Sequence, residues 1–180
     1  MKPEQSSHHG FTLIEILIVI GIIGILMSVV LPTLNQARDK AQVAAAVVEI
    51  DVLKTVFAQL YDDVGKYPNG ATSYCRTVSG IPNNEVDLSQ ATAGLVANGS
   101  GWANWKGPYV SGVEDPWGTP YYLDEDYQCM ASTTGCKGIN DTGNDSSVIV
   151  SCGPNKAISS GSCTYDTDNV VYRLCDSGSP

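Results

Sequence analysis

The feature that most constrains this chain is an apolar run from Phe11 to Leu31, close to its amino end. The run holds 21 residues, and its only charged residue is Glu15. As an α-helix it would be roughly 31 Å long, which matches the hydrocarbon core of a bilayer. A secretory signal peptide usually has a shorter apolar core, a basic start and a small-residue cleavage site after the core. Because this run is longer and the small residue Gly10 precedes it, the sequence predicts a membrane-spanning helix.

Glu15 is the unusual member of this run. A carboxylate inside a membrane-spanning segment costs roughly 3 kcal/mol on insertion scales, so it needs a partner or a function. No Lys or Arg in the run provides a partner. A cut after Gly10 would give Phe11 a new α-amine, four residues before Glu15. The sequence therefore predicts an amine–carboxylate pair, formed within one chain or between neighbouring chains.

The residues around Gly10 resemble a known family. The stretch G-F-T-L-I-E, followed by the apolar run and Pro32, is similar to the class III leader of type IV prepilins and type II secretion pseudopilins. The resemblance implies that residues 1–10 are a leader, cleaved after Gly10 by a membrane aspartyl prepilin peptidase, and that Phe11 is then N-methylated. It also implies that Phe11, Glu15 and Pro32 take part in assembly.

Helical periodicity continues beyond the apolar run. Apolar residues recur every three or four positions over 34–60, and a second apolar stripe runs beside them over 43–57. Gly65 and Pro68 are the first helix-ending residues that follow. We therefore expect one long helix over residues 11–61.

The two halves of this helix are predicted to have different surroundings. Residues 11–31 are apolar on all sides, so lipid or identical helices must cover them. The second half has an apolar side that is suited to packing on a head. Pro32 removes one backbone donor and is expected to bend the helix between the two halves.

Residues 62–180 have the composition of a loop-rich globular head. Gly, Pro, Asn, Ser and Thr separate three short β-like runs, at 120–123, 148–151 and 170–174. A short helix is expected near 88–96. The sequence predicts an α+β fold in which three or four antiparallel strands lie on the second half of the helix. By resemblance, this is the type IV pilin fold.

Three motifs in the head extend the resemblance. They are YDDVGKYP at 61–68, KGPYV at 106–110 and DPWGTPYYL at 115–123, and they are similar to the body of the major pseudopilin of type II secretion. The acidic run at 124–126 is interpreted as a solvated loop rather than a site.

The resemblance also implies a calcium site. SCGPN at 151–155 and the stretch at 166–170 are similar to the calcium-binding end of the major pseudopilin, which would make Ser151, Asn155, Asp166 and Asp168 the ligands. Calcium prefers six to eight oxygen ligands of this kind. The family has Asp where this chain has Asn155, so one negative charge is lost and weaker binding is expected. Calcium is the only cofactor that we expect.

Six cysteines follow the long helix, and none forms a Cys-x-x-Cys pair, which disfavours zinc or iron–sulfur ligation. Outside the membrane they predict three disulfides, for which 15 connectivities are open. Short loops favour Cys129–Cys136 and Cys152–Cys163, leaving Cys75–Cys175.

Composition excludes several function classes. A formal net charge of −9 argues against nucleic acid as a partner. The only histidines are His8 and His9, inside the expected leader, so the processed chain would lack His-based catalytic and metal sites. No GxSxG, HExxH, P-loop or GxGxxG motif is present. We therefore expect a protein that is not an enzyme.

By resemblance, the expected function is that of a structural subunit of a helical homopolymer, the pseudopilus of type II secretion. The alternative is a major or minor pilin of an extracellular type IV pilus. The implied partners are further copies, the prepilin peptidase, an inner-membrane assembly platform with its ATPase, and minor pseudopilins or pilins. The chain would cross the bacterial inner membrane once with its head in the periplasm, and the filament would be periplasmic or extracellular. Tip subunits often lack a charge at the position of Glu15, so its presence favours a repeated subunit.

Overall fold

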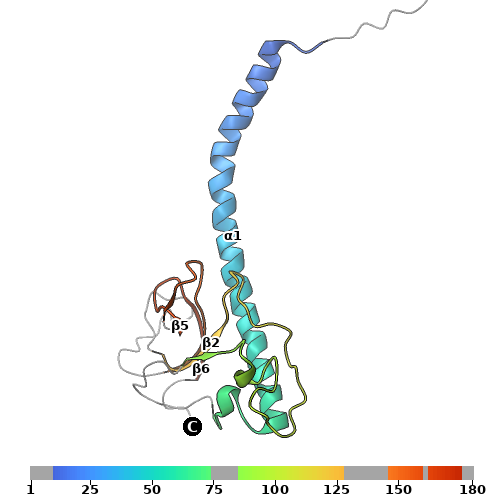
Figure 1. Ribbon diagram of the computed structural model, residues 1–180. Coiled ribbons are helices and arrows are strands. Elements are labelled where there is room, and N and C mark those ends of the chain that lie inside the picture. Colours follow the sequence, from blue (N-terminus) through green and yellow to red (C-terminus); the bar gives the residue numbers. More distant parts are fainter. Residues whose placement is uncertain (1–9, 74–84, 128–145, 160–161, 176–180) are drawn as a thin grey trace, which may run out of the picture. The chain divides into compact units, whose positions relative to one another are not determined.

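A computed structural model describes residues 10–73, 85–127, 146–159 and 162–175. It divides into two compact units, residues 1–40 and 41–180. A single helix, α1 (Leu13–Val64), has 52 residues and belongs to both units (Figure 1). The helix predicted over 11–61 is confirmed, with its ends displaced by two or three residues.

In the first unit, α1 is exposed along its whole length. Pro32 lies inside the helix, and α1 continues through it. Two hydroxyls on either side turn back to the helix backbone: Ser28 Oγ donates to the Ile25 carbonyl at 2.7 Å, and Thr33 Oγ1 donates to the Val30 carbonyl at 2.8 Å. These bonds satisfy the polar atoms of an otherwise apolar surface without partners from outside the helix.

In the second unit, α1 buries one side. Its buried residues follow the three-and-four spacing of an amphipathic helix: Ala46, Ile50, Leu53, Val56, Phe57 and Leu60. Three valines of the predicted stripes, Val47, Val48 and Val52, are exposed instead. The periodicity thus predicted the helix correctly, but the apolar residues extend around more of its surface than the head covers.

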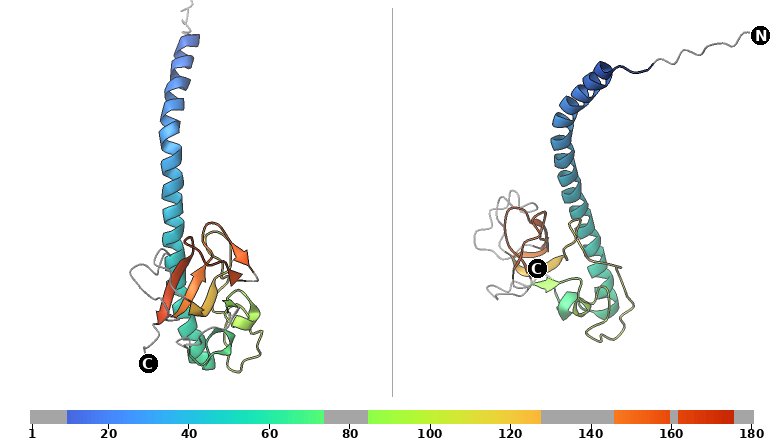
Figure 2. Two further views of the ribbon diagram at one scale, coloured as in Figure 1. Left: turned by 90° about the vertical axis from the view of Figure 1, so that its left-hand side faces the viewer. Right: turned by 45° about the horizontal axis from the view of Figure 1, so that its top comes forward.

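The head contains a four-stranded antiparallel sheet (Figure 2). Its strands, in spatial order, are β1 (Val86–Asp87), β2 (Tyr122–Tyr127), β3 (Ser146–Ser151) and β6 (Val170–Cys175). A separate two-stranded ribbon is formed by β4 (Ile158–Ser159) and β5 (Ser162–Cys163). The three predicted runs became β2, β3 and β6, and the α+β fold is confirmed.

For this part of the chain, one prediction was confirmed only in part and another was wrong. The short helix expected near 88–96 is a single 3₁₀ turn at Ala91–Ala93, because Gly94 has a left-handed φ of 81° and ends it. The acidic run at 124–126 is not a solvated loop: β2 continues through it, and Asp124 is buried. A strand buries alternate residues, so a charged residue in an inward position is buried with them.

Two apolar clusters cover opposite faces of the sheet. Leu123, Ile149 and Val170 pack with the buried side of α1. Their neighbours in the strands, including Val148, Val150 and Val171, form the second cluster with Cys152 and Cys163. This alternation follows from the two-residue period of a strand, and it places a disulfide loop over the face turned away from α1.

Candidate functional site at the amino end of the long helix

Thr12 and Glu15 form a reciprocal cap where α1 begins. The Thr12 backbone N–H and hydroxyl both donate to Glu15 Oε2 at 2.8 Å, and the Glu15 backbone N–H donates to Thr12 Oγ1 at 3.4 Å. This is a capping box, in which Thr12 is the N-cap and Glu15 is the third helical residue. The carboxylate also lies at the positive end of the helix dipole.

The capping box shows what sequence reasoning missed. The T-L-I-E spacing is the signal for such a box, whereas the charge of Glu15 had indicated only a cationic partner. The structure gives this carboxylate a neutral partner within its own first turn. Both bonds from Thr12 end on Oε2, so among the described residues Oε1 accepts no hydrogen bond.

The predicted processing residues lie just before this cap. Gly10 and Phe11 precede the first residue of α1, and both are exposed, with Phe11 85% accessible. A peptide bond in such a non-helical, exposed segment is accessible to a protease. The structure thus places Gly10, Phe11 and Glu15 within one short stretch, while Pro32 lies several turns further along α1.

The apolar surface that follows is long enough to cross a membrane. The most apolar part of α1 has no residue buried within the described structure. Its large aliphatic residues, from Leu13 to Leu31, are all exposed. Since this surface is apolar all round, it requires lipid or other helices as its surroundings.

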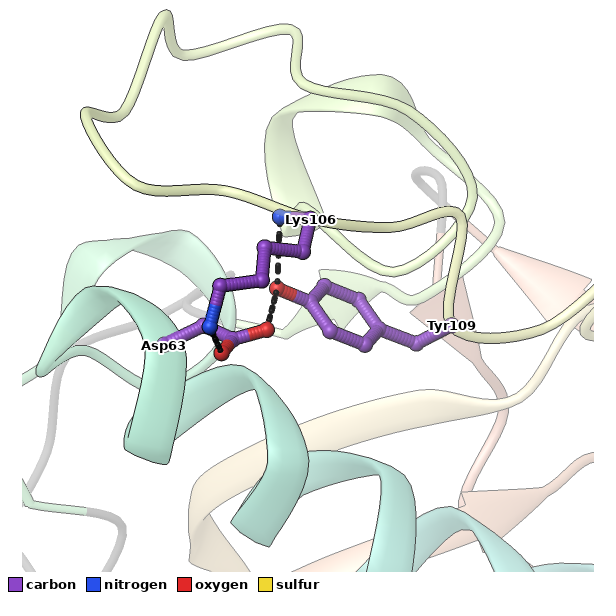
Figure 3. A network of polar contacts seen from close by, with 3 residues as sticks. All are labelled: Asp63, Lys106 and Tyr109. Atoms are coloured by element: carbon purple, nitrogen blue, oxygen red, sulfur yellow. Dashed lines mark hydrogen bonds and ion pairs between the residues drawn. The ribbon is translucent and has the colours of Figure 1, made fainter.

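In the second unit, a polar cluster attaches the KGPYV motif to the last turn of α1 (Figure 3). Lys106 Nζ lies 2.5 Å from Asp63 Oδ1, and the Tyr109 hydroxyl donates to Asp63 Oδ2 at 3.0 Å. The hydrogen bond from Lys106 is the main cause that lowers the pKa of Asp63. A carboxylate is unfavourable at a helix carboxyl end, so the cation of Lys106 offsets this cost and fastens the loop.

The DPWG motif is held together by Asp115, which is buried. Its Oδ1 accepts the backbone N–H groups of Trp117 at 3.0 Å and Thr119 at 2.9 Å. Its Oδ2 accepts the hydroxyls of Thr119 at 2.6 Å and Ser151 at 2.5 Å. One carboxylate therefore joins the turn to β3.

Comparison with known proteins agrees with this geometry. Residues 5–31 match the family described as the prokaryotic N-terminal methylation motif. The type II secretion system core protein G of Aeromonas hydrophila is 32% identical over 123 residues, which cover 68% of this chain and 74% of that protein. The chain belongs to the type IV pilin-like proteins.

Other relatives of this pilin-like protein are named as a pilin and a fimbrial protein. The type IV major pilin protein PilE1 of Neisseria gonorrhoeae is 42% identical over 64 residues, or 36% of this chain and 39% of that protein. A fimbrial protein of Neisseria meningitidis serogroup B is 41% identical over 88 residues, or 48% of this chain and 52% of that protein. The matches thus span about two fifths to half of these pilins. No solved structure matches the chain.

The segments predicted to bind calcium lie together in the pilin-like head. Asn155 Nδ2 donates to Asp166 Oδ2 at 2.6 Å, and the Asp168 backbone N–H donates to Asp166 Oδ1 at 2.9 Å. Gly153 has a φ of 73°, and a Cβ there would lie 2.1 Å from the Asp168 carbonyl oxygen. Only glycine allows the two segments to approach so closely.

The side chains in this arrangement do not form a calcium cage. The Asn155 amide directs its nitrogen at Asp166, because its oxygen accepts the Ala157 backbone N–H at 2.8 Å. The Ser151 hydroxyl is directed at Asp115. Among the described residues, no three His, Cys, Asp or Glu side chains form a group that could hold a metal ion. In this arrangement, the atom of Asn155 beside Asp166 is a nitrogen donor rather than an oxygen ligand.

One predicted disulfide is confirmed. Cys152 and Cys163 are bonded, and they close the loop that carries β4. The proposed pairs Cys129–Cys136 and Cys75–Cys175 depend on residues outside the described part of the chain.

Proposed function

We propose that this pilin-like protein is the repeated structural subunit of a helical filament, the pseudopilus of a type II protein secretion system. The observation that carries the proposal is the first half of α1. It is apolar on every side and exposed, and it begins at Leu13, two residues after the accessible Gly10–Phe11 bond. Such a surface suits two environments in turn, first the membrane and then a bundle of identical helices.

Processing would change the partner of Glu15. Removal of residues 1–10 by a prepilin peptidase gives Phe11 an α-amine, which is then methylated. A charged amine is a stronger donor to a carboxylate than a hydroxyl. Within the membrane, Thr12 satisfies Glu15 through Oε2, and in the filament the amine of a neighbouring Phe11 would bind at Oε1.

This pairing would set the register of the filament. Apolar helices packed side by side slide at little cost, because many positions give similar contacts. A buried carboxylate that misses its amine is costly, by a few kcal/mol. Correct docking therefore brings each Glu15 to the amine of a neighbouring Phe11, and displaced packings are disfavoured.

The secretion pseudopilus is favoured over an extracellular pilus. The similarity to core protein G covers 68% of this chain and is therefore too long to be confined to the helix, whereas the match to the gonococcal pilin covers 36%. The head contains the KGPYV and DPWG motifs, and the structure gives each of them a defined hydrogen-bonded role. An extracellular type IV pilus, in which this chain is a major or minor pilin, remains the alternative.

The proposed location and partners follow from this assignment. The chain would cross the bacterial inner membrane once, with its head in the periplasm, until an assembly platform and its ATPase extract it into the filament. Minor pseudopilins would share the same filament. The calcium site stays a prediction for which the side chains, as arranged, provide no support.

The proposal is tested with Glu15→Val and with Ile16→Val as a matched control, each made in a host that carries the secretion machinery. We expect both variants to be cut after Gly10 and inserted in the membrane. The filament yield of Glu15→Val should fall at least about tenfold, since a misdocking penalty of about 1.4 kcal/mol already gives that factor. Filaments are counted by electron microscopy, and the new amino terminus is identified by mass spectrometry.

Two results would contradict the proposal. One is a mature protein that retains its leader, and the other is normal filament assembly by Glu15→Val. Deletion of the chain should also abolish secretion of the system's substrates. A surface pilus with intact protein secretion would favour the alternative.

A further inference from the structure

The second unit carries an apolar groove that the processing and assembly residues do not explain. Its cavity of about 270 Å³ lies between α1 and residues 110–114, which precede β2. Val48 and Val52 on α1, with Val110 and Val113 opposite, form its apolar lining. Val48 is 64% exposed and Val52 is 54% exposed, although both belong to the apolar stripes of the helix.

The rim of this groove is acidic. Glu49 and Glu114 both line it, and among the described residues no lysine or arginine does. Glu49 Oε2 accepts the Tyr121 hydroxyl at 2.7 Å, whereas Glu114 is exposed and has no ion pair with any described residue. The occupant should therefore combine an apolar surface with a positive charge.

A stretch of this same chain has that combination. Leu34, Arg38 and Ala41 share one face of α1, since they are spaced four and three residues apart. All three are exposed, and Arg38 makes no ion pair with the described residues. The two ion pairs of the described chain use other cations, Lys54 and Lys106.

We propose that the groove binds the Leu34–Ala41 segment of α1 from a second copy of this chain, with Arg38 of that copy against Glu114 and Glu49. This occupant is favoured because its positive charge complements the acidic rim and its apolar residues match the apolar lining. The inference rests on the proposed filament, in which helices of neighbouring copies lie alongside one another. It adds a second subunit contact, separate from the one at Glu15.

A charge exchange tests this pairing in the full-length chain. Glu114→Lys and Arg38→Glu each place like charges together, so each should lower filament yield at least about tenfold. The double variant Glu114→Lys/Arg38→Glu restores opposite charges between these two positions while Glu49 stays unchanged, so its yield should recover at least about threefold above that of either single variant. Asp62→Lys, which alters another exposed carboxylate on α1, should have little effect.

Filling the groove provides a second test. Gly112 lines it, has an ordinary φ, and a Cβ there would meet no atom within 4 Å. Gly112→Leu should therefore fold but block the occupant, and filament yield should fall. Ser111→Leu adds the same side chain at an exposed neighbouring position outside the groove and should assemble normally.

Folding of each variant is checked through its abundance in the membrane and its Cys152–Cys163 disulfide. If the double variant assembles as poorly as each single variant while remaining folded, the pairing with a second copy is wrong. In that case, a defect in Gly112→Leu would point to a different protein in the groove. If Gly112→Leu assembles normally, the groove is not an interface. Absence of filaments from the unaltered chain would overturn the proposed function together with this inference.

Discussion

At the residue scale, the hydrogen bonds around Tyr165 require that one neighbouring carboxyl group is protonated. The Tyr165 hydroxyl is directed at two carboxylates, Glu85 at 2.6 Å and Asp124 at a shorter distance. A hydroxyl has one hydrogen, so it can donate to only one of them, and the other carboxyl must carry a proton to complete the pair. Asp124 is the buried member, and burial raises its pKa to about 7.

This raised pKa predicts that the stability of the head depends on pH. An unfolded Asp titrates near pH 4, so between about pH 4 and 7 the folded chain binds one more proton than the unfolded chain. The contribution of Asp124 to the free energy of unfolding should therefore be fully present below about pH 4 and be lost as pH rises to 7, by up to roughly 4 kcal/mol. Denaturant unfolding across this range measures the slope.

Asp124→Asn is the matched variant for this pH dependence. It keeps the shape of the side chain but cannot titrate, so the slope between about pH 4 and 7 should flatten. The backbone N–H of Asp126, which donates to Asp124 Oδ1 at 2.9 Å, keeps an acceptor in this variant. An unchanged slope would show that another group carries the proton.

Asn155 is the second residue whose chemistry can be tested. Asn155→Asp replaces an amide donor, 2.6 Å from Asp166, with a second carboxylate. The change should lower the melting temperature by several degrees without calcium, because like charges then face each other. Calcium at millimolar concentration should restore the melting temperature of this variant, since it supplies the missing positive charge.

The original chain is the control for the calcium test. Its amide already occupies the position beside Asp166, so we expect its melting temperature to change little with calcium. Asn155→Ser removes the amide without adding charge and should not acquire calcium dependence. A rise of several degrees for the original chain would show that Asn155 turns its oxygen to the ion, as the resemblance to the major pseudopilin implies.

At the element scale, the first turn of α1 depends on its cap. Thr12→Val removes the hydroxyl that bonds Glu15, at a cost of about 1 kcal/mol to the helix start. Amide hydrogen exchange in the first turn should become about fivefold faster in detergent, measured by nuclear magnetic resonance. Thr12→Ser keeps the hydroxyl and should behave like the original chain. Equal exchange in all three proteins would mean that the hydroxyl is not needed, and that the backbone N–H of residue 12 and the dipole hold Glu15 without it.

Sequence patterns predicted where helices and strands form better than they predicted which residues of those elements are buried. The apolar period predicted α1 because 3.6 residues per turn leave a recognisable repeat, and the short loop between Cys152 and Cys163 predicted their bond. The exposure of Val48 and Val52 was not predictable, because periodicity gives the apolar residues of a helix but not how much of them a head covers.

The candidate site was only partly predictable for a related reason. The spacing of Gly10, Phe11 and Glu15 is local, and the sequence reveals it directly. The acidic run at 124–126 resembled a solvated loop because nothing nearby in the sequence explains a buried carboxylate. Asp124 accepts its hydrogen bond from Tyr165, about 40 residues later. Contacts of this kind depend on how the strands align, which composition does not record.

At the scale of the whole molecule, the two units have different requirements for their surroundings. Every buried apolar residue of the described chain lies at Ala46 or later, and the sheet, both apolar clusters and the Cys152–Cys163 bond belong to residues 41–180. Residues 10–40, the described part of the first unit, contribute no buried residue to this core. A head that contains its own core should fold without the membrane segment.

This separation predicts that residues 41–180, exported to an oxidising compartment, form a soluble monomer. The head should unfold in one cooperative transition, because α1 and the sheet share a single apolar cluster. Circular dichroism on heating gives the transition, and sedimentation gives the oligomeric state. The full chain should require detergent, since its exposed aliphatic residues from Leu13 to Leu31 have no cover of their own. A head that aggregates or melts without a transition would show that the membrane half of α1 is needed for folding. Assembly would then have to keep the two halves of α1 together during extraction from the membrane.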